Sequence, residues 1–228
     1  MSPAPRPRPG SPKRPPPDGP PLAGLVLCGG ASRRMGVDKA LLAVEGVPLV
    51  LRVAGRLSRV AHPVILAPGA PGRLGDLGYQ EVADAVPGEG PLAGLVAGLE
   101  ASPHLLTAVV AVDMPLASPE VFRLLAALRG EEDAVVPVTA DGPQPLHAVY
   151  ARSALPALRA ALAGGRLALR AALEGLRVRE VGEDEWRRAD PAGTFALNLN
   201  TAADLARLSV APPGSARRPR RGGASGRV

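Results

Sequence analysis

Aromatic residues are scarce in this chain, since phenylalanine, tryptophan and tyrosine together make up 2% of its 228 residues. A core must therefore be packed from leucine, valine and alanine, and the 46% of hydrophobic residues provide ample material for one medium-sized domain. The scarcity also argues against a surface that binds nucleic acid by stacking bases on aromatic side chains.

Cysteine and long apolar runs are nearly absent as well. The only cysteine, Cys28, excludes an intramolecular disulfide and a cysteine-based zinc site. No apolar run approaches the roughly 18 residues of a membrane span, and the N-terminus lacks the apolar stretch of a signal peptide. We therefore expect a cytoplasmic protein in a reducing compartment, without a membrane partner.

Lysine is also scarce, with 2 residues against 25 arginines. The net charge of +6 is concentrated at the two ends of the chain. Residues 1–21 contain ten prolines and carry +3, while residues 211–228 contain five arginines and no acid. Both segments are too polar and too rich in proline or glycine to fold alone, so we expect disordered tails around a folded domain at 22–210. That domain is near neutral, and nucleic acid is not an expected partner.

Between the tails, apolar runs alternate with helical patterns, which predicts an α/β fold with a mainly parallel sheet. The predicted strands are Leu22–Leu27, Pro63–Ala67, Ala108–Val112 and Ala134–Val138. The predicted helices are Pro48–Arg59, Leu92–Glu100, Pro119–Arg129, Arg152–Leu162, Leu167–Leu176 and Thr201–Leu208. Ligands bind at the carboxyl ends of the strands in such sheets.

The first predicted strand runs into a glycine-rich segment, Leu27-Cys28-Gly29-Gly30, that is followed by Arg33, Arg34 and Lys39. Glycines let backbone N–H groups approach phosphate, and the three side chains add positive charge. The spacing fits neither the G-x-G-x-x-G dinucleotide fingerprint nor a P-loop, whose lysine directly follows the last glycine. The segment therefore predicts a nucleoside triphosphate site of another kind.

Asp113 follows the buried strand 108–112 and precedes Pro115, which cannot continue a sheet ladder. A carboxylate at a strand end can hold Mg²⁺, which prefers oxygen ligands and keeps substrate phosphate and water in its shell. The same aspartate could instead start a turn or cap the helix that begins at Ser118-Pro119. The residues alone leave both interpretations open.

A third loop, starting at Asp84, leads into the helix predicted at 92–100. Gly94 and Gly98 lower the helical propensity of that segment, which indicates close approach of its backbone to a ligand or to a neighbouring strand. Asp84 is either a nucleotide contact or a turn residue.

Five motifs in this order resemble the molybdenum cofactor guanylyltransferase (MobA-type) family. The first loop matches the family signature L-A-G-G-x-S-x-R-M-G-x-D-K, with Cys28 in place of the usual alanine. The others are an aspartate shortly before G-P-L-A-G, D-x-P-x after a strand, Q-P-L-x-x-x-Y, and a closing N-x-N-T-x-x-D-L. The resemblance extends from residue 22 to about 208.

The resemblance implies a three-layer Rossmann-like nucleotidyltransferase fold and the transfer of GMP from GTP to Mo-molybdopterin, with release of pyrophosphate. It implies that Lys39, Asp113 and Arg34 serve catalysis and that Asp113 binds Mg²⁺. The GTP contacts that it implies are Leu27, Cys28, Gly29, Gly30, Arg33, Lys39, Asp84 and Asp113. Acceptor contacts are expected from Gln144, Pro145, Asn198 and Asn200.

Two reactive side chains near these motifs are not expected to take part. A phosphate nucleophile is already ionised at neutral pH and needs no general base, so His147 is expected to pack or to face solvent. Cys28 is expected to be a small residue that closes a buried strand.

Three alternatives remain open. The first is another transferase of the same fold, such as a cytidylyltransferase, although cytidine-using relatives tend to carry alanine at the position of Gly29. The second is a non-catalytic adaptor that binds the molybdenum cofactor and uses the tails to dock on a molybdoenzyme or cofactor-delivery protein. The third is a nucleic-acid-binding module, which the near-neutral core disfavours.

Overall fold

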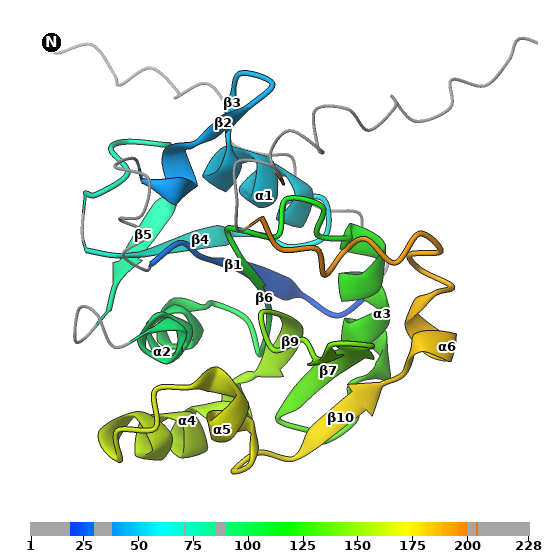
Figure 1. Cartoon of the computed structure of the whole chain (residues 1–228). Helices are drawn as coiled ribbons and strands as arrows, with labels where there is room; N and C mark the ends of the chain where they lie inside the picture. The colour runs from blue at the N-terminus through cyan, green and yellow to red at the C-terminus, as the bar shows by residue number, and fades with distance from the viewer. Residues whose placement is uncertain (1–18, 30–37, 71, 85–89, 200–203, 205–228) are drawn as a thin grey trace, which may run out of the picture.

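A computed structural model describes residues 19–29, 38–70, 72–84, 90–199 and 204, and it places one central sheet between two layers of helices (Figure 1). The strands are β1 Leu22–Leu27, β2 Ala43–Val44, β3 Val47–Pro48, β4 Val64–Gly69, β5 Gln80–Ala83, β6 Leu106–Ala111, β7 Ala134–Thr139, β8 Gly142–Pro143, β9 His147–Ala151 and β10 Val178–Val181. The helices are α1 Leu49–Leu57, α2 Pro91–Ala101, α3 Pro119–Leu128, α4 Leu155–Ala163, α5 Leu169–Leu173 and α6 Glu183–Trp186, with 3₁₀ turns η2 Lys39–Leu41 and η3 Arg152–Ala154.

The main sheet has the strand order β10-β7-β9-β6-β1-β4-β5, with β8 paired to β7. Parallel pairs join β1 to β4 and β6, β4 to β5, and β10 to β7. Only β9, which lies between β6 and β7, and the short β8 run antiparallel to their neighbours in the described sheet. The predicted fold class, a three-layer α/β fold with a mostly parallel sheet, is confirmed.

Alternate residues of the central strands face opposite helical layers, as the period of two in a strand requires. Val26 of β1 packs in one cluster with residues of α1, α3 and α6. Its neighbours Leu25 and Leu27 pack in a second cluster with residues of α2, α4 and α5. Both faces of β1 are therefore buried, which explains why its sequence reads as an unbroken apolar run.

Close packing explains the two glycines of α2. A Cβ at Gly98 would lie 2.3 Å from a methyl carbon of Leu25, so any larger residue would force the buried Leu25 side chain to move. A Cβ at Gly94 would lie 3.1 Å from Leu27 and 3.2 Å from a carboxylate oxygen of Asp84. Gly94 therefore lets α2 approach β1 and the side chain of Asp84. Of the two explanations that the sequence left open for these glycines, the structure supports close approach to a neighbouring strand.

The four predicted strands are all present, and β1 has the predicted bounds. The helix predicted at 152–162 begins as the 3₁₀ turn η3 before α4, and the helix predicted at 167–176 is reduced to the five residues of α5. The helix predicted at 201–208 lies outside the described residues except for Asp204, as do residues 1–18 of the first predicted tail and all of the second, 211–228. Among the described helices, none has the length and apolar character needed to cross a bilayer.

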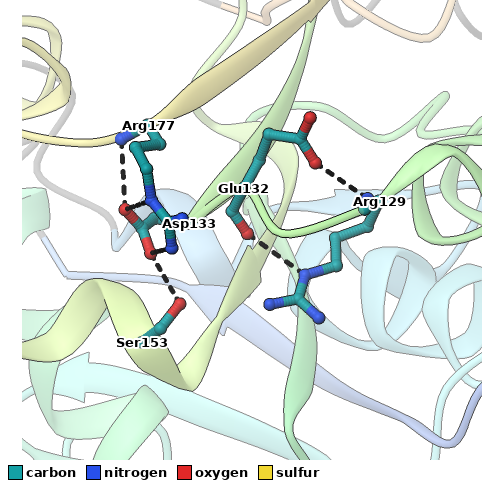
Figure 2. A network of polar contacts seen from close by, with 6 residues as sticks. Arg129, Glu132, Asp133, Ser153 and Arg177 are labelled. Carbon is teal, nitrogen blue, oxygen red and sulfur yellow. Dashed lines mark hydrogen bonds and ion pairs between the residues drawn. The ribbon is translucent and has the colours of Figure 1, made fainter.

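A polar network fastens the starts of β7 and β10 to one another. Figure 2 shows the carboxylate of Asp133 between Arg177 and Ser153, with a Ser153 Oγ to Asp133 Oδ1 distance of 2.6 Å. The backbone N–H and the side chain of Arg177 both donate to Asp133. Burial opposes ionisation of Asp133, but the hydrogen bonds from Arg177 and Ser153 outweigh it and lower its pKa from 3.8 to about 2.

Replacing Asp133 by asparagine should lower the free energy of unfolding by about 2 kcal/mol at pH 7. Because the folded-state pKa is lower than the unfolded-state value, this stabilisation is present above about pH 4 and disappears as the pH falls through about 2. Urea unfolding at pH 7, 5, 4 and 3 measures the effect, with the exposed neighbour Glu131→Gln as the control. A difference from wild type that stays constant over this range would show that ionisation of Asp133 is not its source.

Candidate active site

The carboxyl ends of the three central strands lie together at one edge of the sheet. Cys28, just after β1, donates its N–H to Ala67 O of β4 at 3.0 Å. On the other side, Val112 N donates to Leu27 O at 3.0 Å. The segments that follow β1, β4 and β6 therefore leave the sheet side by side, and the predicted site residues Leu27, Cys28 and Gly29 lie between the other two.

Lys39 and Asp113 form an ion pair at this edge although 74 positions separate them in the sequence. Lys39 Nζ lies 3.3 Å from Asp113 Oδ2, and the side chains are 21% and 28% exposed. The other carboxylate oxygen, Oδ1, is buried and has no hydrogen-bond partner in the described part of the chain. Asp113 thus presents one paired oxygen and one buried oxygen that is able to accept a further ligand.

A structural use of Asp113 as a helix cap is ruled out. Ser118 is the N-cap of α3, and its side chain accepts from Val121 N at 3.3 Å. The backbone carbonyl of Asp113 has a separate function, since it accepts from Leu199 N at 2.8 Å and so brings a late segment of the chain to the site.

Asp84 lies on the far side of β1 from Asp113, in a setting lined by glycines. Its Oδ2 lies 3.8 Å from where a Cβ of Gly29 would be and 3.6 Å from that of Gly69. Its Oδ1 is buried and lacks a hydrogen-bond partner among the described residues. Burial raises the pKa of Asp84, and the nearby charge of Arg73 partly opposes this shift.

Arg73, which no sequence motif indicated, connects several of these segments. Its Nε donates to Pro68 O at 2.9 Å, one terminal nitrogen donates to Cys28 O, and the other pairs with Asp38. Asp38 in turn caps η2, because its Oδ1 accepts from Ala40 N at 3.0 Å. Asp38 had a sequence signal, its place directly before Lys39 in the signature, whereas one arginine among 25 in a glycine-rich loop has none.

Three of the four expected acceptor residues, Gln144, Pro145 and Asn198, lie in segments that reach the end of β6 or the residues just after it. Ala111 N donates to Leu146 O at 3.0 Å, which places the segment containing Gln144 and Pro145 beside that strand end. The amide nitrogen of Gln144 donates to Thr139 Oγ1 at 2.8 Å and to Gly142 O at 3.0 Å. Asn198 is exposed and directly precedes Leu199. Gln144 and Pro145 lie in the segment between β8 and β9.

Four candidates cannot be placed. Gly30, Arg33, Arg34 and Asn200 lie outside the described residues, so their contacts with nucleotide or acceptor stay predictions.

His147 and Cys28 are buried packing residues, as predicted. The His147 ring stacks on Phe122 with ring centroids 3.9 Å apart, its Nε2 accepts from Ser118 N, and burial lowers its pKa to about 3. Burial raises the pKa of the Cys28 thiol to about 12, although the charge of Arg73 opposes the shift. Both side chains are uncharged at neutral pH, which fits neither an acid–base nor a nucleophilic role.

Several known proteins are similar to this chain in sequence. The chain is 35% identical over 190 residues to a probable molybdenum cofactor guanylyltransferase of Chloroflexus aggregans, covering 81% of this chain and 91% of that protein. A probable enzyme of the same description from Deinococcus radiodurans is 37% identical, with 83% and 94% covered.

A solved structure has the same fold. The crystal structure of molybdopterin-guanine dinucleotide biosynthesis protein A from Archaeoglobus fulgidus superposes with a TM-score of 0.72 at 29% sequence identity, covering 82% of this chain and 96% of that one. Residues 24–187 match the family model of the MobA-like NTP transferase domain. This range contains the carboxyl ends of the central strands and the Lys39–Asp113 pair and covers most of the chain. The chain therefore belongs to the MobA-like NTP transferase family.

Proposed function

We propose that this protein transfers GMP from GTP to the phosphate of Mo-molybdopterin and releases pyrophosphate, in the cytoplasm. The observation that carries the proposal is the Lys39–Asp113 pair at the carboxyl edge of the sheet, with one buried carboxylate oxygen left without a partner in the described chain. Relatives at 35% and 37% identity are described as probable molybdenum cofactor guanylyltransferases, which supports the choice of substrates.

The residues at this edge fit a magnesium ion. Mg²⁺ is usually held by one or two carboxylates together with substrate phosphates and water. The buried Oδ1 of Asp113 is an oxygen donor of the required kind. The described residues contain no group of three acidic, histidine or cysteine side chains that could hold a metal without substrate. We therefore assign Mg²⁺ to Asp113, which would hold the ion and where it would supply neutralisation of the phosphate charge of GTP.

In the proposed reaction, a phosphate oxygen of Mo-molybdopterin attacks the α-phosphorus of GTP and the bond to the β-phosphate breaks. Negative charge develops on the α-phosphate oxygens and on the leaving pyrophosphate, so catalysis depends on positioning and on electrostatic stabilisation. Lys39 supplies positive charge beside Asp113, and Arg33 and Arg34 are assigned to pyrophosphate or acceptor phosphate. The backbone at Leu27, Cys28, Gly29 and Gly30 is assigned to the nucleotide, together with Asp84.

The acceptor is assigned to the side of the site where β6 and β9 meet. Gln144, Pro145, Asn198 and Asn200 are the proposed contacts, and the bond from Leu199 N to Asp113 O supports a place for Asn198 close to the metal ligand. A molybdoenzyme or a delivery protein is the proposed recipient of the product.

The proposal is tested by incubating the protein with α-labelled GTP, Mo-molybdopterin and Mg²⁺ and separating the products. Label is expected in a molybdopterin guanine dinucleotide, in a one-to-one ratio with pyrophosphate. Binding of Mo-molybdopterin without any label transfer would instead support the adaptor alternative.

Gly29→Ala should lower kcat/KM for GTP by about tenfold and reduce discrimination against CTP. The added methyl group narrows the space for the base, and a purine needs more room than a pyrimidine. The backbone of Gly29 is not in the left-handed region, and among the described residues a Cβ there would meet no atom closer than 3.7 Å, so stability should be unaffected. The control is Gly55→Ala in α1, where a Cβ meets no atom of the described chain within 4 Å. Equal kcat/KM values for GTP in both variants would contradict the proposed place of the base.

A further inference from the structure

Arg73 lies among the candidate site residues, yet its side chain binds the protein itself at three places. Its guanidinium joins the carbonyl of Pro68 after β4, the carbonyl of Cys28 after β1, and the carboxylate of Asp38. Three of its five N–H donors are therefore spent on three different segments of the chain. The side chain is 25% exposed, and that of Asp38 is 21% exposed.

Asp38 links Arg73 to the 3₁₀ turn η2, which begins with Lys39. Both of its carboxylate oxygens are engaged, Oδ2 by Arg73 and Oδ1 by Ala40 N, which is the capping bond of η2. Lys39 is the first residue of η2, and its Nζ reaches Asp113 Oδ2 at 3.3 Å. A continuous series of contacts thus runs from the end of β1 through Arg73 and Asp38 to Lys39 and Asp113.

We infer that Arg73 is a positioning residue for phosphate transfer, which fixes η2 against the ends of β1 and β4 and thereby sets the place of Lys39. A planar guanidinium with five donors in a fixed fork can join three acceptors at once, whereas a lysine at the same position offers one compact charge. The inference rests on the proposed function for the role of Lys39, but the geometry that it concerns does not depend on which nucleotide is used.

The kinetic test is a double-variant cycle. Arg73→Gln should lower kcat/KM for the nucleotide by about 10- to 100-fold, because a displacement of about 1 Å at a charged group has an effect of that size. In a chain that already carries Lys39→Ala, Arg73→Gln should add less than about a threefold loss, since coupled residues are not additive. Losses that multiply in the double variant would overturn the inference and indicate that Arg73 contacts substrate itself.

The matched control is Arg159→Gln, which removes an arginine that is also paired with an acid, Glu100, through bonds between α4 and α2. It should leave kcat/KM within about twofold of wild type. Asp38→Asn keeps an oxygen acceptor for Ala40 N and removes the charged partner of Arg73, so it should reproduce the loss and the coupling of Arg73→Gln. If Arg73→Gln fails to fold, Asp38→Asn is used for the same measurements.

A second readout needs no activity, because the chain contains only two lysines, Lys13 and Lys39. Full-length protein labelled with ¹⁵N-lysine should give two backbone amide signals, and Lys13→Arg assigns them. The Lys39 signal should move in Arg73→Gln and stay in place in Arg159→Gln, with Lys13 as the internal reference. An unmoved Lys39 signal would overturn the inference even if the protein uses GTP, and a moved signal would support it even if the protein uses another nucleotide.

Discussion

Asp113→Asn should lower kcat/KM by about 10³-fold or more while the fold is retained. The substitution removes the negative charge and replaces one carboxylate oxygen of the residue that we assign to Mg²⁺, and electrostatic stabilisation of the transferring group accounts for most of the rate in such reactions. Stability should change little, because the ion pair to Lys39 is partly exposed and such pairs contribute little. The expected change in Tm is within about 2 °C.

Steady-state kinetics over a range of Mg²⁺ concentrations, together with thermal unfolding, measure this effect. Asp184→Asn, at an exposed position in the first turn of α6, is the control for loss of one carboxylate. Metal-dependent pyrophosphate release at a near wild-type rate in Asp113→Asn would remove this residue from the mechanism.

Lys39→Ala should lower kcat by about 10²-fold or more, because the lysine places a full positive charge beside Asp113, where charge develops on phosphate oxygens. The loss should appear in kcat and in kcat/KM alike, which is the pattern of an interaction made in the transition state. Lys13→Ala, the only other lysine substitution that the chain offers, should have no effect.

A rise in KM with unchanged kcat would make Lys39 a uniform binding residue rather than a transition-state contact. The losses of Lys39→Ala and Asp113→Asn should also fail to multiply when both are combined, since the two side chains act on the same phosphates.

Four of the five inner strands, β1, β4, β6 and β7, could be predicted from the sequence because they are largely buried, whereas the inner strand β9 was not among the predicted strands. β1 reads as an unbroken apolar run, as does the segment 108–112 that overlaps β6, and the structure buries every residue of both strands. The loops that follow them carry the family motifs, so the approximate place of the candidate site at the carboxyl edge was also predictable.

The two edge strands could not be predicted in this way. β5 and β10 lie at the two ends of the strand order, and their residues are largely half-buried or exposed. Their sequences, Q-E-V-A and V-R-E-V, therefore lack the apolar signal that identified the inner strands. The same reason explains the missed hairpin of β2 and β3, which turns at Glu45 and Gly46 with positive φ at both positions.

Arg73 was unpredictable for a different reason. Its three contacts come from residues 5, 35 and 45 positions away along the chain, and only the fold brings them together. Asp38 and Lys39 stand next to each other in the signature, so their partnership at η2 was visible in principle, whereas the side chain that holds Asp38 comes from a loop with no motif.

The most direct test of the proposed guanylyltransferase function is pyrophosphate release by the full-length protein with Mo-molybdopterin and Mg²⁺, measured separately with GTP, CTP, ATP and UTP. We expect release with GTP, dependence on both Mo-molybdopterin and Mg²⁺, and a kcat/KM for GTP at least about tenfold above that for any other nucleotide. Preferential use of CTP, or pyrophosphate release that does not require Mo-molybdopterin, would contradict the proposal.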